Sequence, residues 1–185
     1  DILVNCAGFG LYAPCHEMNW EHFRKLWEVN FFGAVRLALA ALPHLRKRHG
    51  TIVNISSVAG KIPLPYMGAY CATKFALNTI SSAMRMELKQ VGVRVVTVLP
   101  GRVATQFHFA AYRDGQNLPG VFQRRKSEGL SAEKVARVAL NAMLRGKREV
   151  VVPWRLRLAM AASALMPGLR ESVLSRMVKT ESADW

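Results

Sequence analysis

Tyr70 and Lys74 lie four residues apart in the stretch Tyr-Cys-Ala-Thr-Lys, inside a segment with the pattern of a helix. Four residues make about one helical turn, so both side chains are predicted to project from the same face. A tyrosine normally loses its proton at about pH 10. A lysine ammonium one turn away is expected to lower that pKa by favouring the phenolate. The pair could therefore give and take a proton at neutral pH.

Ser57 and Asn30 are the other candidates for chemistry. Ser57 lies thirteen residues before Tyr70, and its hydroxyl can bond a substrate carbonyl or alkoxide. Asn30 lies within a predicted helix, where Asn is a poor helix former. Two interpretations stay open for it: a bond to nearby backbone, or a water that links the Lys74 ammonium to solvent. No His or carboxylate joins this set, and Ser57 lacks the Gly-x-Ser-x-Gly elbow, so a Ser-His-Asp hydrolase is not supported.

The charge of the chain is strongly positive, with 26 Lys and Arg against 12 Asp and Glu and a net charge of +14. Between Arg102 and Arg157 there are twelve basic and four acidic residues. An excess of this kind fits a phosphate-bearing cofactor, a membrane surface, nucleic acid or a solvated basic surface. The basic residues are dispersed and no nucleic-acid-binding motif occurs, so no nucleic-acid partner is predicted.

The cysteines and the apolar runs indicate the cellular compartment in which the protein is expected. Cys6, Cys15 and Cys71 form no Cys-x-x-Cys pair, and the odd count argues against a disulfide framework. A reducing, cytoplasmic compartment is expected, and no metal site is predicted. No hydrophobic stretch reaches the ~20 residues of a membrane span. The sequence opens directly on an apolar run without an initiator Met, so we expect it to be the middle of a larger protein.

The hydrophobic pattern alternates strands with helices. Strands are predicted at 2–5, 51–56, 93–99 and 149–152, and helices at 20–48, 66–90 and 131–145, the first capped by Asn19 and ended by Gly50. This order predicts an α/β fold, an open parallel sheet with helices on both faces. Ligands of such sheets bind at the carboxyl ends of the strands, where the candidate residues fall.

Five linked motifs resemble those of the short-chain dehydrogenase/reductase family. In chain order they are VNCAG at 4–8, VNFFG at 29–33, ISSVAG at 55–60, YCATK at 70–74 and PGRVAT at 100–105. The similarity covers residues 1–153 and implies a Rossmann-like doubly wound sheet. Residues 154–185 would then form a separate basic, amphipathic C-terminal extension.

The resemblance implies an oxidoreductase that transfers a hydride between NAD or NADP and a carbonyl or hydroxyl carbon. Tyr70 would be the general acid/base, Ser57 would orient the reacting oxygen, Lys74 would bind the nicotinamide ribose, and Asn30 would complete a proton relay. Cofactor contacts are implied for Asn5, Ala7, Gly8, Tyr70, Lys74, Pro100, Gly101, Val103 and Thr105. Homo-oligomers are expected by family analogy.

The chain departs from the family pattern in two ways. Cys6 stands where the family most often has a second Asn. The Gly-rich turn that cradles the cofactor pyrophosphate is missing, as is the residue that selects NAD or NADP, so the Rossmann-like sheet is predicted to be N-terminally incomplete, with an exposed edge. We expect this polypeptide alone to be unstable and to bind nicotinamide cofactor poorly. The alternative functions are an inactive fragment and a non-enzymatic protein that binds a partner or an anionic surface.

Two further segments bear on the substrate. Phe9, Leu11, Tyr12 and Met18 before the first long helix, and Phe107, Phe109, Tyr112, Leu118, Val121 and Phe122 after Thr105, could line an apolar pocket with a movable lid, or could simply pack the lid on the sheet. The first interpretation favours a hydrophobic alcohol or ketone. The tail from Trp154 has an apolar run at 158–166 followed by Pro167-Gly168. It could lie in a membrane interface, cover the pocket or meet a partner subunit.

Overall fold

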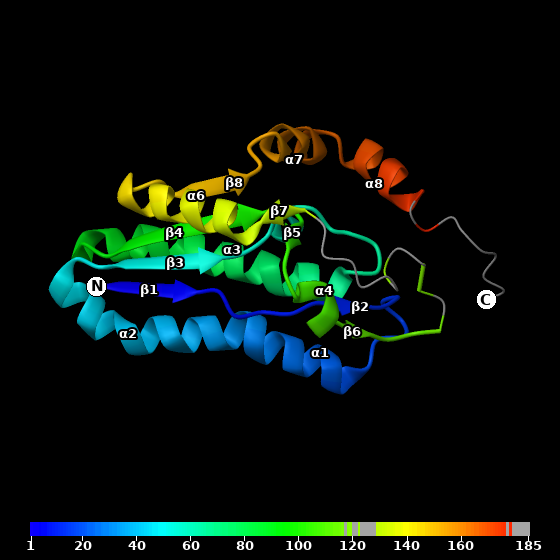
Figure 1. The fold of residues 1–185 in the computed structure, drawn as a ribbon, viewed down its shortest axis with the longest axis horizontal. Helices are drawn as coiled ribbons and strands as arrows, with labels where there is room; N and C mark the ends of the chain where they lie inside the picture. The colour runs from blue at the N-terminus through cyan, green and yellow to red at the C-terminus, as the bar shows by residue number, and fades with distance from the viewer. Residues whose placement is uncertain (117, 120–121, 123–128, 177, 179–185) are drawn as a thin grey trace.

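Four parallel strands form the main sheet of the protein, whose computed structural model describes residues 1–116, 118–119, 122, 129–176 and 178. The strands lie in the spatial order β1-β3-β4-β8 (Figure 1). Their bounds are Ile2–Asn5 for β1, Thr51–Ile55 for β3, Arg94–Pro100 for β4 and Glu149–Val152 for β8. The prediction of a parallel α/β sheet from these four segments is confirmed.

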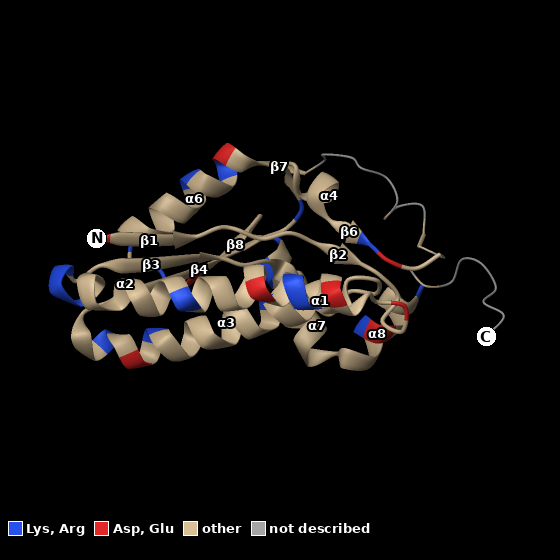
Figure 2. Ribbon diagram, turned by 90° about the horizontal axis from the view of Figure 1, so that it is seen from below, with Lys and Arg blue, Asp and Glu red and all other residues tan. Residues whose placement is uncertain are grey.

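Helices cover both faces of this sheet (Figure 2). The α6 helix (Ala132–Leu144) lies on one face, and α2 (Ala34–Arg48) and α3 (Gly68–Leu88) lie on the other. The alternation of β4 side chains explains the arrangement, because successive residues of a strand point to opposite faces. Val96 packs with Val135 of α6, whereas Val95 packs with Ala38 and Leu45 of α2. The sheet is therefore doubly wound, as expected.

The helical run Trp20–Arg48 has three parts: α1 (Trp20–Trp27), the π-helical segment η1 (Glu28–Gly33) and α2. Asn19 caps it as predicted, since its side chain accepts from two backbone N–H groups. The run ends at Arg48, as predicted, but the residue that adopts the left-handed conformation is His49, with φ of 49°, and not Gly50. By length and composition the run could cross a membrane, but core helices pass that test too.

A row of polar side chains fastens α3 to the sheet. Lys74, Asn78, Ser81 and Arg85 recur every three or four residues, so they share one face of the helix. Lys74 Nζ donates to Ile55 O at 3.2 Å, Asn78 Nδ2 to Gly60 O at 2.9 Å, and Arg85 Nε to Val95 O at 2.9 Å, while Ser81 Oγ accepts from Asn54 Nδ2 at 2.7 Å. This face of α3 is therefore fixed at four successive points.

The start and end of α3 follow from its neighbouring residues. Tyr66 has a φ of 61°, in the left-handed region, so the helix begins at Gly68 rather than at Tyr66 as predicted. The short η3 segment (Lys89–Val91) continues α3, and Gly92, with a φ of 74°, ends it. The short η2 segment (Val58–Gly60) follows β3 directly.

Two pairs of short parallel strands lie beyond the carboxyl ends of the main sheet. They pair β2 (Leu11–Tyr12) with β6 (Tyr112–Arg113), and β5 (Val103–Ala104) with β7 (Leu130–Ser131). The four-residue helix α4 (Phe107–Ala110) lies between β5 and β6. Each of these strands has only two residues, too few to give a hydrophobic period, so the sequence did not predict them.

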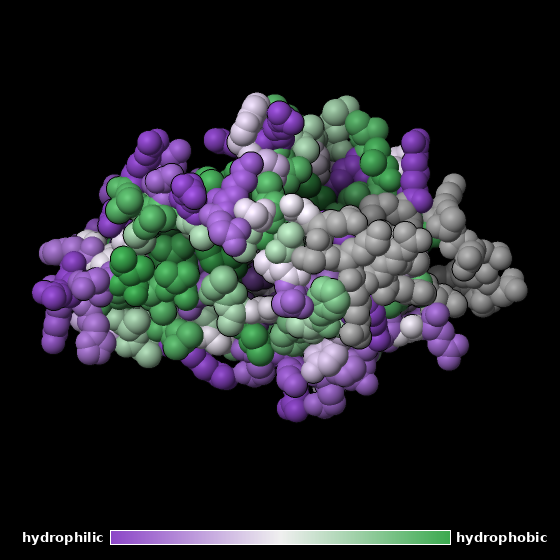
Figure 3. All heavy atoms as spheres, viewed as in Figure 1, coloured by the Kyte–Doolittle hydropathy of each residue, from purple (hydrophilic) through white to green (hydrophobic). Residues whose placement is uncertain are grey.

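The two ends of the chain leave apolar surface uncovered. Along β1, at the edge of the sheet, Ile2 and Val4 are 54% and 55% exposed, which confirms the predicted open edge. Figure 3 shows hydrophobic surface gathered beside β1 and α6. At the other end, α7 (Leu156–Leu165) and α8 (Pro167–Ser175) meet at the predicted break, Pro167-Gly168.

Candidate active site

A single cavity of about 1110 Å³ opens at the carboxyl ends of the strands, and Ser57, Tyr70 and Lys74 all line it. Ser57 follows β3, and its Oγ caps η2 by accepting from the Ala59 N–H at 3.1 Å. Tyr70 and Lys74 lie in the first two turns of α3, one turn apart on the face toward Ser57. The structure thus brings the predicted Ser, Tyr and Lys together. We call these three residues the catalytic corner.

Tyr70 is buried, and the Ser57 hydroxyl lies beside it in the same cavity. Burial raises the pKa of Tyr70 well above its ordinary value, because a buried phenolate loses its hydration, and the Ser57 hydrogen bond opposes this shift. The prediction that the Tyr70 pKa is lowered is therefore wrong here, since desolvation outweighs the effect of a neighbouring cation. Tyr70 remains protonated at neutral pH and is available as a proton donor.

Lys74 is only 4% exposed, and burial lowers its pKa to about 8. Its Nζ lies 5.8 Å from the centre of the Tyr70 ring and donates to Ile55 O, the one hydrogen bond it makes within the described residues. An ammonium carries three donors, so others stay available for a ligand. A Cβ on Gly8 would lie 3.6 Å from this Nζ, and the glycine therefore keeps the backbone close to it. The surroundings of Lys74 fit a ribose hydroxyl of a nicotinamide cofactor.

Asn30 occupies the π-helical segment and is almost fully buried. Its Nδ2 donates to Phe9 O at 3.0 Å and to Thr73 Oγ1 at 3.3 Å, and its Oδ1 accepts from Phe9 N–H at 3.1 Å. The first interpretation, a bond to nearby backbone, is thus observed. Asn30 holds the loop after β1 against α3, beside the catalytic corner.

The predicted cofactor residues after β1 divide between the cavity and the sheet. Gly8 lines the cavity, as does Cys6, which stands where the family most often has an Asn. The Asn5 side chain turns away, donating to Asn54 Oδ1 at 2.8 Å and to Ala34 O at 3.3 Å. Asn5 thus ties β1 to β3 and α2, and Ala7 lies between it and Gly8 in the loop.

The predicted residues after β4 form the far wall of the same cavity. Pro100, Gly101, Val103 and Thr105 all line it. Gly101 N–H donates to Val152 O at 2.7 Å, so the turn is held by β8. Ser56, the hydroxyl next to Ser57, makes a long contact of 3.5 Å to Lys74 O and does not bond Tyr70, which supports the choice of Ser57.

Apolar side chains from two distant segments cover the catalytic corner. We call residues 9–12 and 105–113, which contain β2, α4 and β6, the lid. The Phe107 ring lies edge-on to Tyr70 with centroids 5.3 Å apart, and Phe9 meets Tyr112 in the same way at 5.3 Å. Of the predicted pocket residues, Tyr12, Phe107 and Phe122 line the cavity, Leu11 and Leu118 are buried in the packing, and Val121 lies outside the described residues.

One polar pair in the lid was missed by the sequence analysis. Tyr12 Oη and His108 Nδ1 are 2.6 Å apart, their rings stack in near-parallel planes, and both residues line the cavity. Arg113 lies over the Tyr12 ring at 5.4 Å and bonds the backbone oxygen of His108 through Nη2. The residues are 96 positions apart, and only the β2–β6 pairing brings them together. No local spacing could have revealed this pair.

A metal centre has no support in the part of the chain that the structure describes. Within residues 1–116, 118–119, 122, 129–176 and 178, no three His, Cys, Asp or Glu side chains gather to hold an ion. The closest approach to such a cluster is His22 Nδ1 with Asp114 Oδ1 at 2.7 Å, and Asp114 Oδ2 also accepts from Asn19 N–H at 3.0 Å. This pair fastens α1 to the end of β6, outside the cavity.

Comparison with known families gives a consistent match. A family model described as short chain dehydrogenase matches residues 1–115. Dehydrogenase/reductase SDR family member 7B from Bos taurus is 31% identical over 183 residues, which cover 98% of this chain and 56% of that protein. The chain thus spans a little over half the length of this relative.

Solved structures share the fold. A short-chain dehydrogenase from Sphingobium yanoikuyae in complex with NADPH matches with a TM-score of 0.72 and 29% identity, over 100% of this chain and 68% of that one. A bulky-bulky ketone specific alcohol dehydrogenase from Comamonas testosteroni matches with a TM-score of 0.68 and 25% identity, over 100% of this chain and 65% of that one.

Proposed function

Because the chain belongs to the short chain dehydrogenase family, we propose that it carries the proton-transfer site of an NAD(P)-dependent oxidoreductase that interconverts a carbonyl and a hydroxyl group. The observation that carries the proposal is the catalytic corner. Tyr70 and Ser57 line the same cavity, and a buried ammonium lies 5.8 Å from the Tyr70 ring. A buried cation next to a buried acid is a costly arrangement that is typical of catalytic sites.

The proposed roles follow from the state of each group. In the reducing direction Tyr70, kept protonated by its raised pKa, gives its proton to the carbonyl oxygen while the Ser57 hydroxyl bonds that oxygen. The Lys74 ammonium favours the phenolate left behind, since an opposite charge stabilises it. Asn30 keeps the loop at Phe9 in place beside Lys74 and would complete a proton relay to solvent.

The cofactor in this proposal is NAD or NADP, which supplies or accepts the hydride when bound. Lys74 and Gly8 on one side and Pro100, Gly101, Val103 and Thr105 on the other would hold its nicotinamide half. The NADPH bound to the Sphingobium yanoikuyae neighbour supports a cofactor of this class. The part of the family pattern that would cradle the pyrophosphate and select NAD or NADP is absent from this sequence.

The proposed substrate is an apolar alcohol or ketone. Beside Tyr70 the cavity is bounded by Leu64, Met67 and Phe107, whose side chains offer no hydrogen-bond donors. The ketone specificity named for the Comamonas testosteroni neighbour is in keeping with a wide apolar site. The Tyr12–His108 pair is a polar point at which such a substrate could be oriented.

Replacement of Tyr70 by Phe in the natural-length protein tests the proposal. Turnover of a ketone with NADH or NADPH is expected to fall by roughly 10²–10⁴, the usual contribution of a positioned acid/base. Cofactor binding, followed by the fluorescence of the reduced nicotinamide, should change little. Tyr112→Phe is the matched control because it removes a lid hydroxyl without touching the corner. Near-normal turnover in Tyr70→Phe would refute the mechanism.

A further inference from the structure

The α7 helix presents an apolar stripe to solvent. Trp154, Leu158 and Leu165 are 68%, 66% and 83% exposed. Leu158, the exposed Ala161 and Leu165 are spaced three and four residues apart, which places them on one side of the helix, and Trp154 lies in the turn just before it. Met160, by contrast, is only partly exposed and lies on the opposite side. The exposed stripe is therefore distinct from the face with which α7 packs on the protein.

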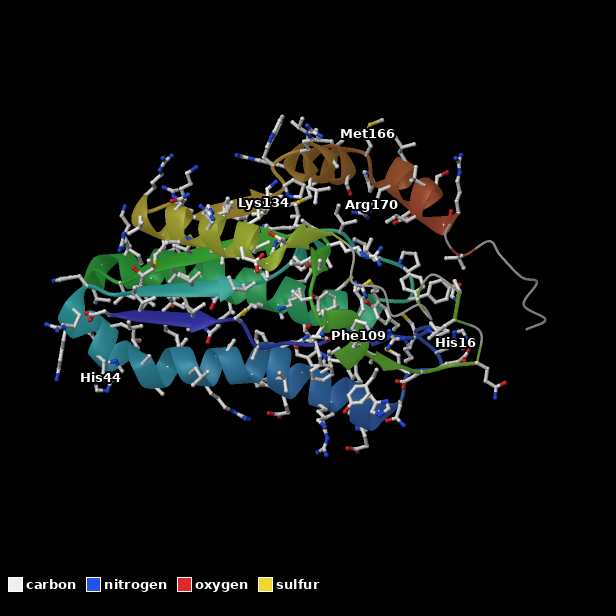
Figure 4. The ribbon with its side chains drawn as sticks, in the orientation of Figure 1. His16, His44, Phe109, Lys134, Met166 and Arg170 are labelled. Atoms are coloured by element: carbon white, nitrogen blue, oxygen red, sulfur yellow. The ribbon has the colours of Figure 1, made fainter. Side chains whose placement is uncertain are left out.

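The stripe continues through the junction into α8. Met166, Leu169 and Val173 are also more than half exposed. Figure 4 shows Met166 pointing away from the body of the molecule, whereas Arg170 points toward it. Leu169 and Val173 are four residues apart and share one exposed side of α8. The two helices thus expose large apolar side chains continuously from residue 154 to residue 173.

Positive charge borders the α7 part of this stripe, and no acidic residue lies within that helix. One residue turns a helix by about 100°, which places Arg155 and Arg157 on opposite flanks of the line from Trp154 to Leu165. Both arginines are exposed. The sequence has no Asp or Glu between Glu149 and Glu171. An apolar line with a Trp at one end and arginines on both flanks matches a helix that lies in the headgroup region of a bilayer.

We infer that α7 and α8 dock the protein on the surface of an anionic lipid bilayer. The helix of ten residues is about 15 Å long, too short to span the hydrocarbon core, so it would lie in the plane of the interface. Acidic headgroups would pair with Arg155 and Arg157, and the net charge of +14 adds a long-range attraction to the same surface. A protein partner would have to bury both arginines in an interface, whereas lipid lets their long stems reach the headgroups.

Because α7 packs beside the cavity, membrane docking would also affect the active site. Leu156, its first residue, packs directly on Gly101, because a Cβ on that glycine would lie 2.7 Å from Leu156 Cδ1. Gly101 lines the cavity of the catalytic corner. Membrane docking would therefore hold the cavity close to the lipid, a source of apolar substrates. This last step rests on the proposed function, but the docking itself does not.

Co-sedimentation of the natural-length protein with vesicles tests the docking without any activity measurement. Binding to phosphatidylcholine vesicles that contain phosphatidylserine should be at least ~10-fold tighter than to phosphatidylcholine alone. Raising the salt from about 0.1 M to about 1 M should remove most of that difference, since the Debye length falls from ~10 to ~3 Å. Equal binding to the two vesicle types would overturn the inference.

Variants locate the contact. The double variant Leu158→Glu/Leu165→Glu should bind the anionic vesicles at least ~10-fold more weakly than the wild type. The double variant Arg155→Gln/Arg157→Gln should bind them about 10-fold more weakly. The matched controls are Met86→Glu, which changes a 71% exposed residue of α3, and Arg46→Gln with Lys47→Gln, which removes two charges from the last turn of α2. Both should bind as the wild type does.

Trp fluorescence supplies a measurement that a folding defect cannot mimic. Anionic vesicles should shift the emission of the wild-type protein to shorter wavelength, and Trp154→Phe should lose most of that shift while it still sediments with the vesicles. A shift that persists in Trp154→Phe would overturn the assignment. So would an oligomer that Leu158→Glu dissociates while vesicle binding is unchanged, because the stripe would then be an interface between copies of the chain.

Discussion

The catalytic corner and the lid face each other across one cavity, yet they are held by different kinds of contact. Ser57, Tyr70 and Lys74 come from the neighbouring elements β3, η2 and α3, where Lys74 bonds Ile55 O of β3 and Ser57 caps η2 through the Ala59 N–H. The lid joins segments about a hundred residues apart through two-residue strands and stacked rings. The contrast shows that neighbouring elements place the catalytic corner, whereas pairing between segments distant in sequence places the lid.

The largest expected effect tests the corner. Lys74→Met removes the buried ammonium while it keeps the length of the side chain, so the Tyr70 phenolate loses its stabilising charge and a cofactor hydroxyl loses a donor. We expect kcat/KM to fall by roughly 10²–10⁴. Steady-state kinetics of the natural-length protein measure this. Lys47→Met, at an exposed position of α2, should leave the kinetics unchanged, and a similar loss in both variants would contradict the assignment.

A smaller effect concerns the stability of the corner. Burial lowers the pKa of Lys74 from 10.5 to about 8, so between these values the unfolded chain binds a proton that the folded protein does not. Stability must therefore rise with pH across this window. Between about pH 8 and about pH 9.5, the free energy of unfolding should increase by ~2 kcal/mol more in the wild type than in Lys74→Met.

Urea unfolding at the two pH values measures that difference. The window ends below about pH 10, where the raised pKa of Tyr70 begins to act in the opposite direction, since the unfolded tyrosine then loses its proton first. If the free energy of unfolding rose equally with pH in the wild type and in Lys74→Met, Lys74 would be hydrated. The corner would then be no more firmly held than the lid.

The smallest expected effect tests the lid. Tyr12→Phe removes the 2.6 Å hydrogen bond to His108 but keeps the ring in its place. A hydrogen bond of this kind contributes about 0.5–1.5 kcal/mol, so KM for an apolar ketone should change by roughly 2–12-fold with little change in kcat. Tyr66→Phe is the control, because that ring packs on Phe122 without a bond to His108. A fall in kcat as large as that of Lys74→Met would place Tyr12 with the corner.

The features that the sequence predicted well are those set by local spacing. The four strands, the Asn19 cap and the helix after residue 130 all depend on residues that lie close together in the sequence. The gathering of Ser57 with Tyr70 follows from strand ends that meet at one edge of a parallel sheet. The order of the five motifs was then enough to identify the family.

The features that escaped prediction depend on contacts distant in sequence or on burial. The Tyr12–His108 pair needs the β2–β6 pairing, and the Asn30 contacts need the loop at Phe9 to fold over a π-helical segment. The direction of the Tyr70 pKa shift was wrong because spacing reveals a neighbouring charge but not the loss of water. The hydrophobic periodicity of a sequence carries no information on contacts between distant residues or on the loss of water around a side chain.

The row of polar anchors along α3 determines how the site can move. Because Lys74, Asn78, Ser81 and Arg85 all bond the sheet side from one face, the helix cannot rotate or slide by one residue without breaking all four contacts. The first turns of a helix ordinarily fray. Here Lys74, one turn beyond Tyr70, is bonded to β3, so the turn that carries Tyr70 is anchored to the sheet where it joins the rest of the helix.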